Sequence, residues 1–176
     1  MNDELLYGVA GRSRDFWGIS GNCQVFRGET ALNMDDKGRV AVPSRYRDDI
    51  KSRSGNTVVV TISLLERCLT VYLMSDWQRI ESELKRLPAL DKKAQGIRHL
   101  LIGHASECEL DGHGRILVSP SLREFASLGK RIKMVGQADK FELWDELAWN
   151  ERREALLGQV EGLLDAPSPA LESLVL

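Results

Sequence analysis

Apolar and polar positions alternate along the chain in a way that predicts two successive units with the same order of elements. In the first unit, four stretches alternate or are rich in β-branched residues, as strands are: residues 27–34, 39–42, 57–64 and 69–73. Residues 44–50 follow Pro43 and are expected to form one or two helical turns. With the helix that closes it, the unit is expected to run β-β-α-β-β-α.

Longer helical patterns follow the strands. Trp77, Ile80 and Leu84 recur at spacings of three and four residues, which predicts one apolar stripe. The start of this helix, SDWQ from Ser75, fits a capping box. Residues 90–103 are expected to bridge the two units as a second helix, with one apolar face: Leu90, Ala94, Ile97 and Leu101. A last helix is expected to run from Trp149 to about residue 164.

The two units share residues as well as pattern. ALNMDDKGRVAVPSRYRDDI aligns with ECELDGHGRILVSPSLREFA, and CLTVYLMSDW aligns with KFELWDELAW in the same order. The first alignment pairs five identical residues: Asp35 with Asp111, Gly38 with Gly114, Arg39 with Arg115, Val42 with Val118, and Arg47 with Arg123. Two matched blocks in one order indicate a duplication. We therefore predict an α+β fold with one half at residues 25–103 and the other at 104–165. In the second half, Ser119 before Pro120 is expected to cap a helix.

The two ends of the chain have no counterpart in the repeat. Residues 1–24 are rich in glycine and serine, and we expect them to be either a mobile arm or the result of a start site assigned too early. The second possibility arises because GTG encodes valine and also serves as a bacterial start codon, so translation could begin at Val25. The alternative is an ordered cap formed by Phe16, Trp17 and Ile19. Residues 166–176 follow the last helix, which Pro167 is expected to end, and form a tail predicted to be mobile.

Composition narrows the class of protein. The 176 residues are 43% hydrophobic and 28% charged, the balance of a globular protein. The N-terminus lacks a secretory signal and no apolar run could span a bilayer, so we expect a cytoplasmic protein without a membrane partner. Cys23, Cys68 and Cys108 are odd in number and include no C-x-x-C pair, which argues against a disulfide framework or a zinc ribbon. The net charge is +4 up to Lys140 and −6 beyond it, so a polyanionic partner is permitted.

Several motifs together resemble a known family. The duplicated Asp-x-x-Gly-Arg turn, FRGE before its first copy, LLIGHASECELDGHGR at its second and VGQADKFELWD after it closely resemble the MraZ transcriptional regulators. The resemblance extends from about residue 25 to residue 157. It implies a duplicated AbrB-like fold in which swapped hairpins form a small β-barrel with flanking helices. It also implies a homo-oligomeric ring that binds repeated promoter sites in double-stranded DNA, at the nucleoid, upstream of the division and cell-wall gene cluster, which such proteins usually repress.

Four side chains in the turns are the candidates for DNA contact. Arg39 and Arg115 are expected to read bases, because a planar guanidinium matches guanine O6 and N7. Lys37 is a point charge suited to phosphate, and His113 occupies the equivalent position in the second turn. Because a neutral imidazole makes that turn less cationic, the two halves are not expected to contribute equally.

Four other residues are expected to shape these turns rather than touch DNA. Gly38 and Gly114 are placed where a tight turn needs positive φ or a close backbone approach. Asp35 and Asp111 are expected to accept turn amides and to orient the arginines, since carboxylates repel phosphate. One chain offers only two turns, so tight binding is expected to require several chains acting on several DNA repeats.

Other interpretations remain open at this stage. Arg39 and Arg115 could serve only to pin their turns by pairing with the aspartates. The chain could instead be a ring-forming adaptor for protein partners, without specific DNA binding. A metal site from His104, Cys108 and His113 is not expected, because their spacing matches no ligand pattern. No enzyme motif, cofactor motif or small-molecule site is recognised, so catalysis is not expected either.

Overall fold

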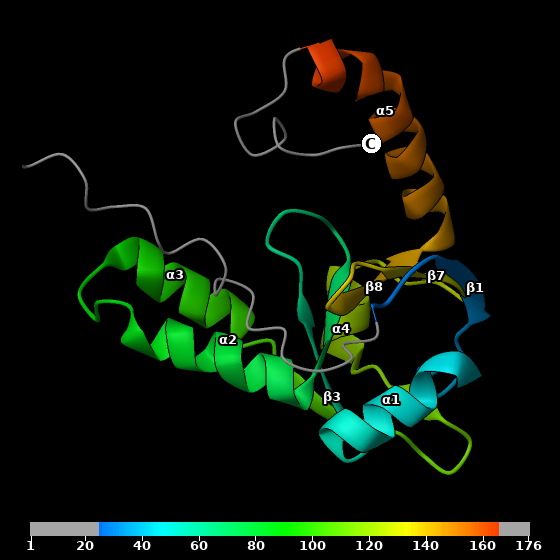
Figure 1. Ribbon diagram of the computed structural model, residues 1–176, viewed down its shortest axis with the longest axis horizontal. Coiled ribbons are helices and arrows are strands. Elements are labelled where there is room, and N and C mark those ends of the chain that lie inside the picture. The colour runs from blue at the N-terminus through cyan, green and yellow to red at the C-terminus, as the bar shows by residue number, and fades with distance from the viewer. Residues whose placement is uncertain (1–24, 166–176) are drawn as a thin grey trace, which may run out of the picture.

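The computed structural model describes residues 25–165, which contain two copies of one unit (Figure 1). The first copy comprises β1 (Glu29–Asn33), β2 (Arg39–Ala41), α1 (Ser44–Ser54), β3 (Thr57–Ile62), β4 (Leu69–Leu73) and α2 (Met74–Arg86). After α3 (Lys92–Leu101), the second copy comprises β5 (Ser106–Glu109), β6 (Arg115–Leu117), α4 (Pro120–Phe125), β7 (Arg131–Gly136), β8 (Lys140–Asp145) and α5 (Glu146–Asp165). The predicted α+β class and the repeated order of elements are confirmed.

Strands of the two copies pair with each other rather than forming separate sheets. One six-stranded sheet has the order β1-β7-β8-β4-β3-β5, and every neighbouring pair is antiparallel. At its edges, β1 of the first copy pairs with β7 of the second, and β5 of the second pairs with β3 of the first. The remaining strands, β2 and β6, form a two-stranded antiparallel ribbon, called the ribbon below, in which Val40 lies opposite Ile116. Both copies are therefore needed to complete the sheet and the ribbon.

A single large core lies between the sheet and the ribbon. Val40 and Ile116 point inward from the ribbon and belong to the same buried cluster as Leu69 and Leu143 of the sheet. Helices α1 and α4 add Tyr46, Ile50 and Leu122 to this cluster. In each ribbon strand the residues next to these inward positions face the other way, because successive side chains of a strand alternate between its two faces.

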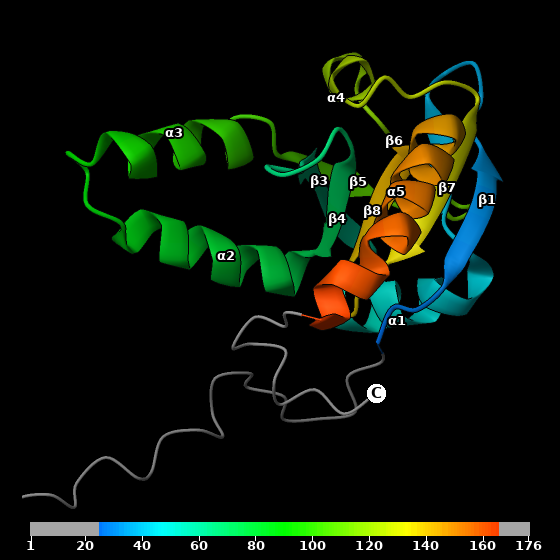
Figure 2. The same cartoon turned by 90° about the horizontal axis from the view of Figure 1, so that it is seen from above.

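The start of helix α5 packs against the opposite face of the sheet, at β7 and β8, and the rest of the helix rises away from the sheet (Figure 1 and Figure 2). A second, smaller cluster of Cys68, Val135 and Trp144 packs there against Trp149 of this helix. Glu29 ties the layers together, since its carboxylate accepts hydrogen bonds from Lys133 Nζ at 2.9 Å and from Trp149 Nε1 at 2.7 Å. The contact with Lys133 holds the pKa of Glu29 below its usual value. The edge strand β1 is thus fastened both to β7 and to α5.

Helices α2 and α3 form a hairpin that projects away from the sheet (Figure 2). The predicted capping box is wrong: α2 begins at Met74, and Ser75 lies inside its first turn without a cap hydrogen bond. The Met74 amide instead donates to Ser54 Oγ at 3.1 Å, so a hydroxyl from the end of α1 takes that place. Helix α3 is shorter than predicted because Asp91 caps it by accepting from the amides of Lys93 and Ala94.

Other details of the predicted helices also differ. Leu90 precedes α3 and is 97% exposed, so it belongs to no buried stripe. Ser119 occupies the N-cap position of α4, but its hydroxyl lies near Ser121 Oγ and caps no amide. Helix α5 extends to Asp165 and begins at Glu146, before the expected start. Within residues 25–165, no helix has the length and hydropathy needed to cross a bilayer. The predictions for residues 1–24 and 166–176 lie outside the described residues.

Phe26 offers a test of how the start of the described chain is held. Its ring is 1% exposed and lies 4.0 Å from the Phe141 ring and 5.3 Å from the Tyr46 ring, measured between centroids. We expect Phe26→Ala to lower the free energy of unfolding by about 3–5 kcal/mol, because it leaves a cavity among these rings. Leu90→Ala is the control, since Leu90 is 97% exposed. Urea denaturation of both variants measures the difference, and equal midpoints would contradict the packing role.

Candidate functional site

The first Asp-x-x-Gly-Arg turn, residues 35–39, leads directly into β2. Its backbone is closed by hydrogen bonds from the Gly38 amide to the Asp35 carbonyl and from the Asp35 amide to the Arg39 carbonyl, at 2.8 and 2.9 Å. The Asp35 carboxylate accepts from the backbone amides of Lys37 and Arg39, and from Arg39 Nε at 2.7 Å. One carboxylate therefore closes the turn and also fixes the direction of the Arg39 side chain.

The second turn, residues 111–115, repeats this geometry before β6. Asp111 accepts from the amides of His113 and Arg115 and from Arg115 Nε at 2.8 Å. Arg115 is held more completely than Arg39, because its Nη2 lies 2.7 Å from Asp111 and its Nη1 lies 3.7 Å from Asp35 of the first turn. Among residues 25–165, the Nη atoms of Arg39 form no hydrogen bond, and its ion pair with Asp35 is closest at Nε. The two turns thus have similar backbones, but the Arg115 guanidinium forms ion pairs with two aspartates and the Arg39 guanidinium with one.

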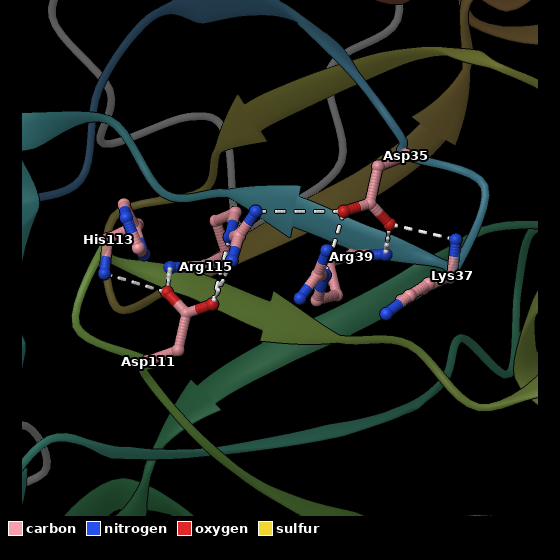
Figure 3. Close-up of polar contacts among 6 residues, drawn as sticks. All are labelled: Asp35, Lys37, Arg39, Asp111, His113 and Arg115. Atoms are coloured by element: carbon pink, nitrogen blue, oxygen red, sulfur yellow. Dashed lines mark hydrogen bonds and ion pairs between the residues drawn. The ribbon is translucent and has the colours of Figure 1, made fainter.

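The ribbon brings all four predicted cationic positions to one place (Figure 3). Lys37 and Asp35 lie at one end of it and His113 and Asp111 at the other, with the two arginines between them. Arg39 stands opposite Leu117, and Arg115 stands opposite Ala41. Directly opposed residues of an antiparallel pair share a face, so both arginines lie on the face that points away from the core. Leu117 lies on the same face and is 55% exposed.

Electrostatics favour the ionised form of both aspartates. Hydrogen bonds from the Arg39 backbone and side chain hold the pKa of Asp35 below its usual value. The Arg115 side chain lowers the pKa of Asp111 further, and the same contact raises the pKa of Arg115. The aspartate and arginine of each turn are therefore both charged and paired near neutral pH, and the acidic groups are partly neutralised by the arginines beside them.

Sequence reasoning missed two arginines that lie under the turns. Arg47 of α1 packs against Gly114 of the second turn, and Arg123 of α4 packs against Gly38 of the first. Both glycines have positive φ, +83° at Gly38 and +72° at Gly114. A Cβ added at Gly38 would lie 2.9 Å from Arg123 Cζ, and one at Gly114 would lie 2.5 Å from Arg47 Cζ. The aligned pair Arg47 and Arg123 was the signal in the sequence that pointed to them.

Other candidate chemistry is separate from the ribbon face. His104 Nδ1 lies 2.9 Å from the carbonyl oxygen of Leu100, and Cys108 is buried in β5. No cluster of three or more metal-ligating side chains occurs in the described part of the chain. Cys68 and Cys108 are unpaired, and burial raises the pKa of Cys68 to about 12 and that of Cys108 above its usual value. These thiols are therefore protonated at neutral pH and poorly reactive.

The family model of MraZ proteins matches this chain twice, over residues 25–99 and again over residues 101–157. The two matches divide the chain in the same way as the repeat. Individual relatives agree. The chain is 49% identical to the "Transcriptional regulator MraZ" of Pseudomonas aeruginosa PAO1 over 137 residues, which are 78% of this chain and 91% of that protein. The proteins of the same name from Pseudomonas syringae pv. syringae B728a and Pseudomonas fluorescens Pf0-1 are 48% and 49% identical over the same shares.

The contact between Gly38 and Arg123 can be separated from backbone strain. Gly28 has φ of +79°, close to that of Gly38, but nothing lies within 4 Å of its would-be Cβ. We expect Gly28→Ala to cost about 1–2 kcal/mol of stability, from the left-handed conformation alone. Gly38→Ala should cost about 1 kcal/mol more, because Arg123 must also move. Chemical denaturation measures both variants. Equal losses would show that Arg123 does not restrict the turn.

The lowered pKa values of the aspartates predict a pH dependence. A carboxyl group whose pKa is lower in the folded state stabilises the fold above its unfolded value of about 4, and this contribution is lost as pH falls through the folded pKa. We therefore expect the stability difference between the wild type and Asp111→Asn to be constant near neutral pH and to shrink in acid below about pH 4. Urea midpoints measured from pH 7 downward test this. A difference that grew with acidity would contradict it.

Proposed function

Because this chain belongs to the MraZ family, we propose that it regulates transcription by binding double-stranded DNA through the exposed face of the ribbon. The observation that carries the proposal is that Arg39 and Arg115, one from each duplicated turn, lie on the same outward face of β2 and β6. The names of the Pseudomonas relatives support regulation of transcription. The outward arginines of the ribbon provide side chains that could bind DNA for this purpose.

The dimensions of the ribbon suit the major groove of B-DNA, which admits a two-stranded β-ribbon. Arg39 and Arg115 are diagonal neighbours across the two strands, since each lies opposite the residue two positions beyond the other. Diagonal neighbours are roughly 7–8 Å apart, about the rise of two base pairs at 3.4 Å each. The two guanidinium groups can therefore address nearby base pairs at once. Lys37 and His113, at the ends of the ribbon, are placed to meet the flanking phosphates.

The ion pairs within the turns leave the two arginines unequally available. Arg39 uses Nε for Asp35, so its two terminal nitrogens can form the bidentate contact that guanine O6 and N7 accept. Arg115 would have to leave its contacts with Asp111 and Asp35 in order to do the same. We infer that Arg39 provides most of the base reading and that Arg115 provides less. The aspartates act by orienting the arginines and contact no DNA.

Affinity in this proposal depends on assembly. Two turns give few phosphate contacts, and such binding is weak and sensitive to salt. A homo-oligomeric ring whose chains engage successive promoter repeats raises the effective concentration of each later contact. Two apolar surfaces away from the ribbon support assembly. One lies on the α2–α3 hairpin, around Ile80 and Leu87, and the other is a groove of about 550 Å³ that includes Leu65, Trp144 and Trp149.

The remaining features follow from the family and are proposed together. The cross-copy pairing of β1, β5 and the ribbon is compatible with an AbrB-like barrel of swapped hairpins. The protein would act in the cytoplasm at the nucleoid, as a repressor of the division and cell-wall gene cluster. The alternative, a ring-forming adaptor for protein partners, uses the same apolar surfaces but gives no role to the outward arginines.

Removal of the Arg39 guanidinium tests the proposal. We expect Arg39→Ala to weaken specific DNA binding by about 1–3 kcal/mol per engaged site, and Arg115→Ala to weaken it less. Arg86→Ala is the control, because it removes an equal charge from an exposed position on α2. Fluorescence anisotropy on DNA from just upstream of the gene, at two salt concentrations, measures the affinities.

Two results would decide against the proposal in different ways. If folded Arg39→Ala bound this DNA like the wild type, Arg39 would serve only its turn. If the wild type bound no DNA even at low salt, where phosphate contacts are strongest, the adaptor alternative would be favoured.

A further inference from the structure

We propose that Arg47 and Arg123 are positioning residues for the DNA-binding turns, and that each one orients the turn of the other copy. This inference rests on the proposed function, because it assigns a role in DNA binding to residues beneath the turns. It differs from that function in naming side chains outside the ribbon. It also predicts a definite pattern of cooperation between the copies.

The second turn lies against an arginine of the first copy. The Arg47 side chain passes so close to Gly114 that a Cβ there would lie 2.6 Å from Arg47 Cδ and 2.5 Å from Cζ. Arg47 Nε donates to the Val42 carbonyl at 2.8 Å, and the Val42 amide donates to the Gly114 carbonyl at 2.9 Å. Arg47 therefore fixes Val42, and Val42 in turn fixes the backbone of the second turn.

The first turn also lies against an arginine of the second copy, although Arg123 lacks the hydrogen bond that Arg47 makes. A Cβ at Gly38 would lie 2.9 Å from Arg123 Cζ and 3.0 Å from Arg123 Nε. The Val118 amide donates to the Gly38 carbonyl at 2.9 Å. Arg123 Nε is buried and has no hydrogen-bond partner among the described residues, so the contact of Arg123 with the first turn is one of packing. The support is reciprocal, because each copy contributes the platform on which the other copy's turn rests.

This arrangement has a direct consequence for the groups that face DNA. The first turn carries Lys37 and Arg39, so the direction of these side chains depends on Arg123. The second turn carries His113 and Arg115, so their direction depends on Arg47. A turn that is already held in place loses less conformational entropy on binding than a loose one. Loss of Arg47 or Arg123 should therefore weaken mainly the DNA contacts made by the turn that this arginine supports.

Double-mutant cycles on DNA affinity test this crossed dependence. We expect Arg123→Ala to raise Kd about threefold to tenfold, within the range for coupled neighbours. Its effect should largely disappear in the Arg39→Ala background and persist in the Arg115→Ala background. Arg47→Ala should show the opposite pattern, since it depends on Arg115 and not on Arg39. Arg45→Ala is the control for loss of charge, because Arg45 lies on α1 near Arg47 but is exposed and bonds to Thr30.

A second measurement does not depend on DNA. Amide exchange at Val42 should become faster in Arg47→Ala, and exchange at Val118 should become faster in Arg123→Ala, each without a matching change at the other valine. If an alanine variant loses its folded structure, Arg47→Met and Arg123→Met repeat the cycles, since methionine keeps an apolar side chain in the position of the arginine stem. Lysine is not a substitute, because it lacks the planar fork.

The possible outcomes distinguish failure of the positioning role from failure of the proposed function. If Arg39→Ala and Arg115→Ala both bind DNA like the wild type, the proposed function has failed and the positioning role fails with it. If these variants weaken binding but all four cycles are additive, only the positioning role is overturned. Coupling within copies, Arg47 with Arg39 and Arg123 with Arg115, would also overturn it.

Discussion

The pairing of β2 with β6 positions the side chains that we propose to contact DNA. These strands are only three residues long, and each comes from a different copy. Their inward residues, Val40 and Ile116, are fully buried in the common core, and their outward residues include both turn arginines. A slip of one residue in either strand would exchange the two faces, placing an arginine in the core and a valine or isoleucine in solvent. Core packing therefore sets the register on which the outward face depends.

Local contacts and long-range contacts orient different parts of the two turns. Within each turn, one aspartate closes the backbone and directs the arginine four residues later, and all of these contacts are local in sequence. Between the turns, Arg47, Arg123 and the valine amides connect segments more than 60 residues apart. The local contacts give each arginine its direction relative to its own turn. The distant contacts give the two turns their direction relative to each other.

This division explains which features the sequence could predict. The repeated units, the strand positions and the aspartate–arginine spacing are local patterns, and the element order read from them is confirmed. Helix starts were less predictable: the hydroxyl that accepts from the Met74 amide belongs to Ser54, twenty residues earlier, rather than to Ser75. The exposed position of Leu90 and the packing of Arg47 on Gly114 also depend on where distant segments meet. Periodicity in the sequence contains no information on contacts between distant segments.

The attachment of β1 to β7 has a consequence for synthesis of the chain. Glu29 and Lys133, which form an ion pair across these strands, are 104 residues apart in the sequence. A ribosome makes β1 early and β7 late, so β1 emerges long before its partner exists. Pairings between distant segments form slowly, and an unpaired strand edge can bind other chains in the interval. Among the described residues, the first strand is therefore expected to be one of the last to pair, and the growing chain is most exposed to aggregation, and most in need of a chaperone, until β7 is made.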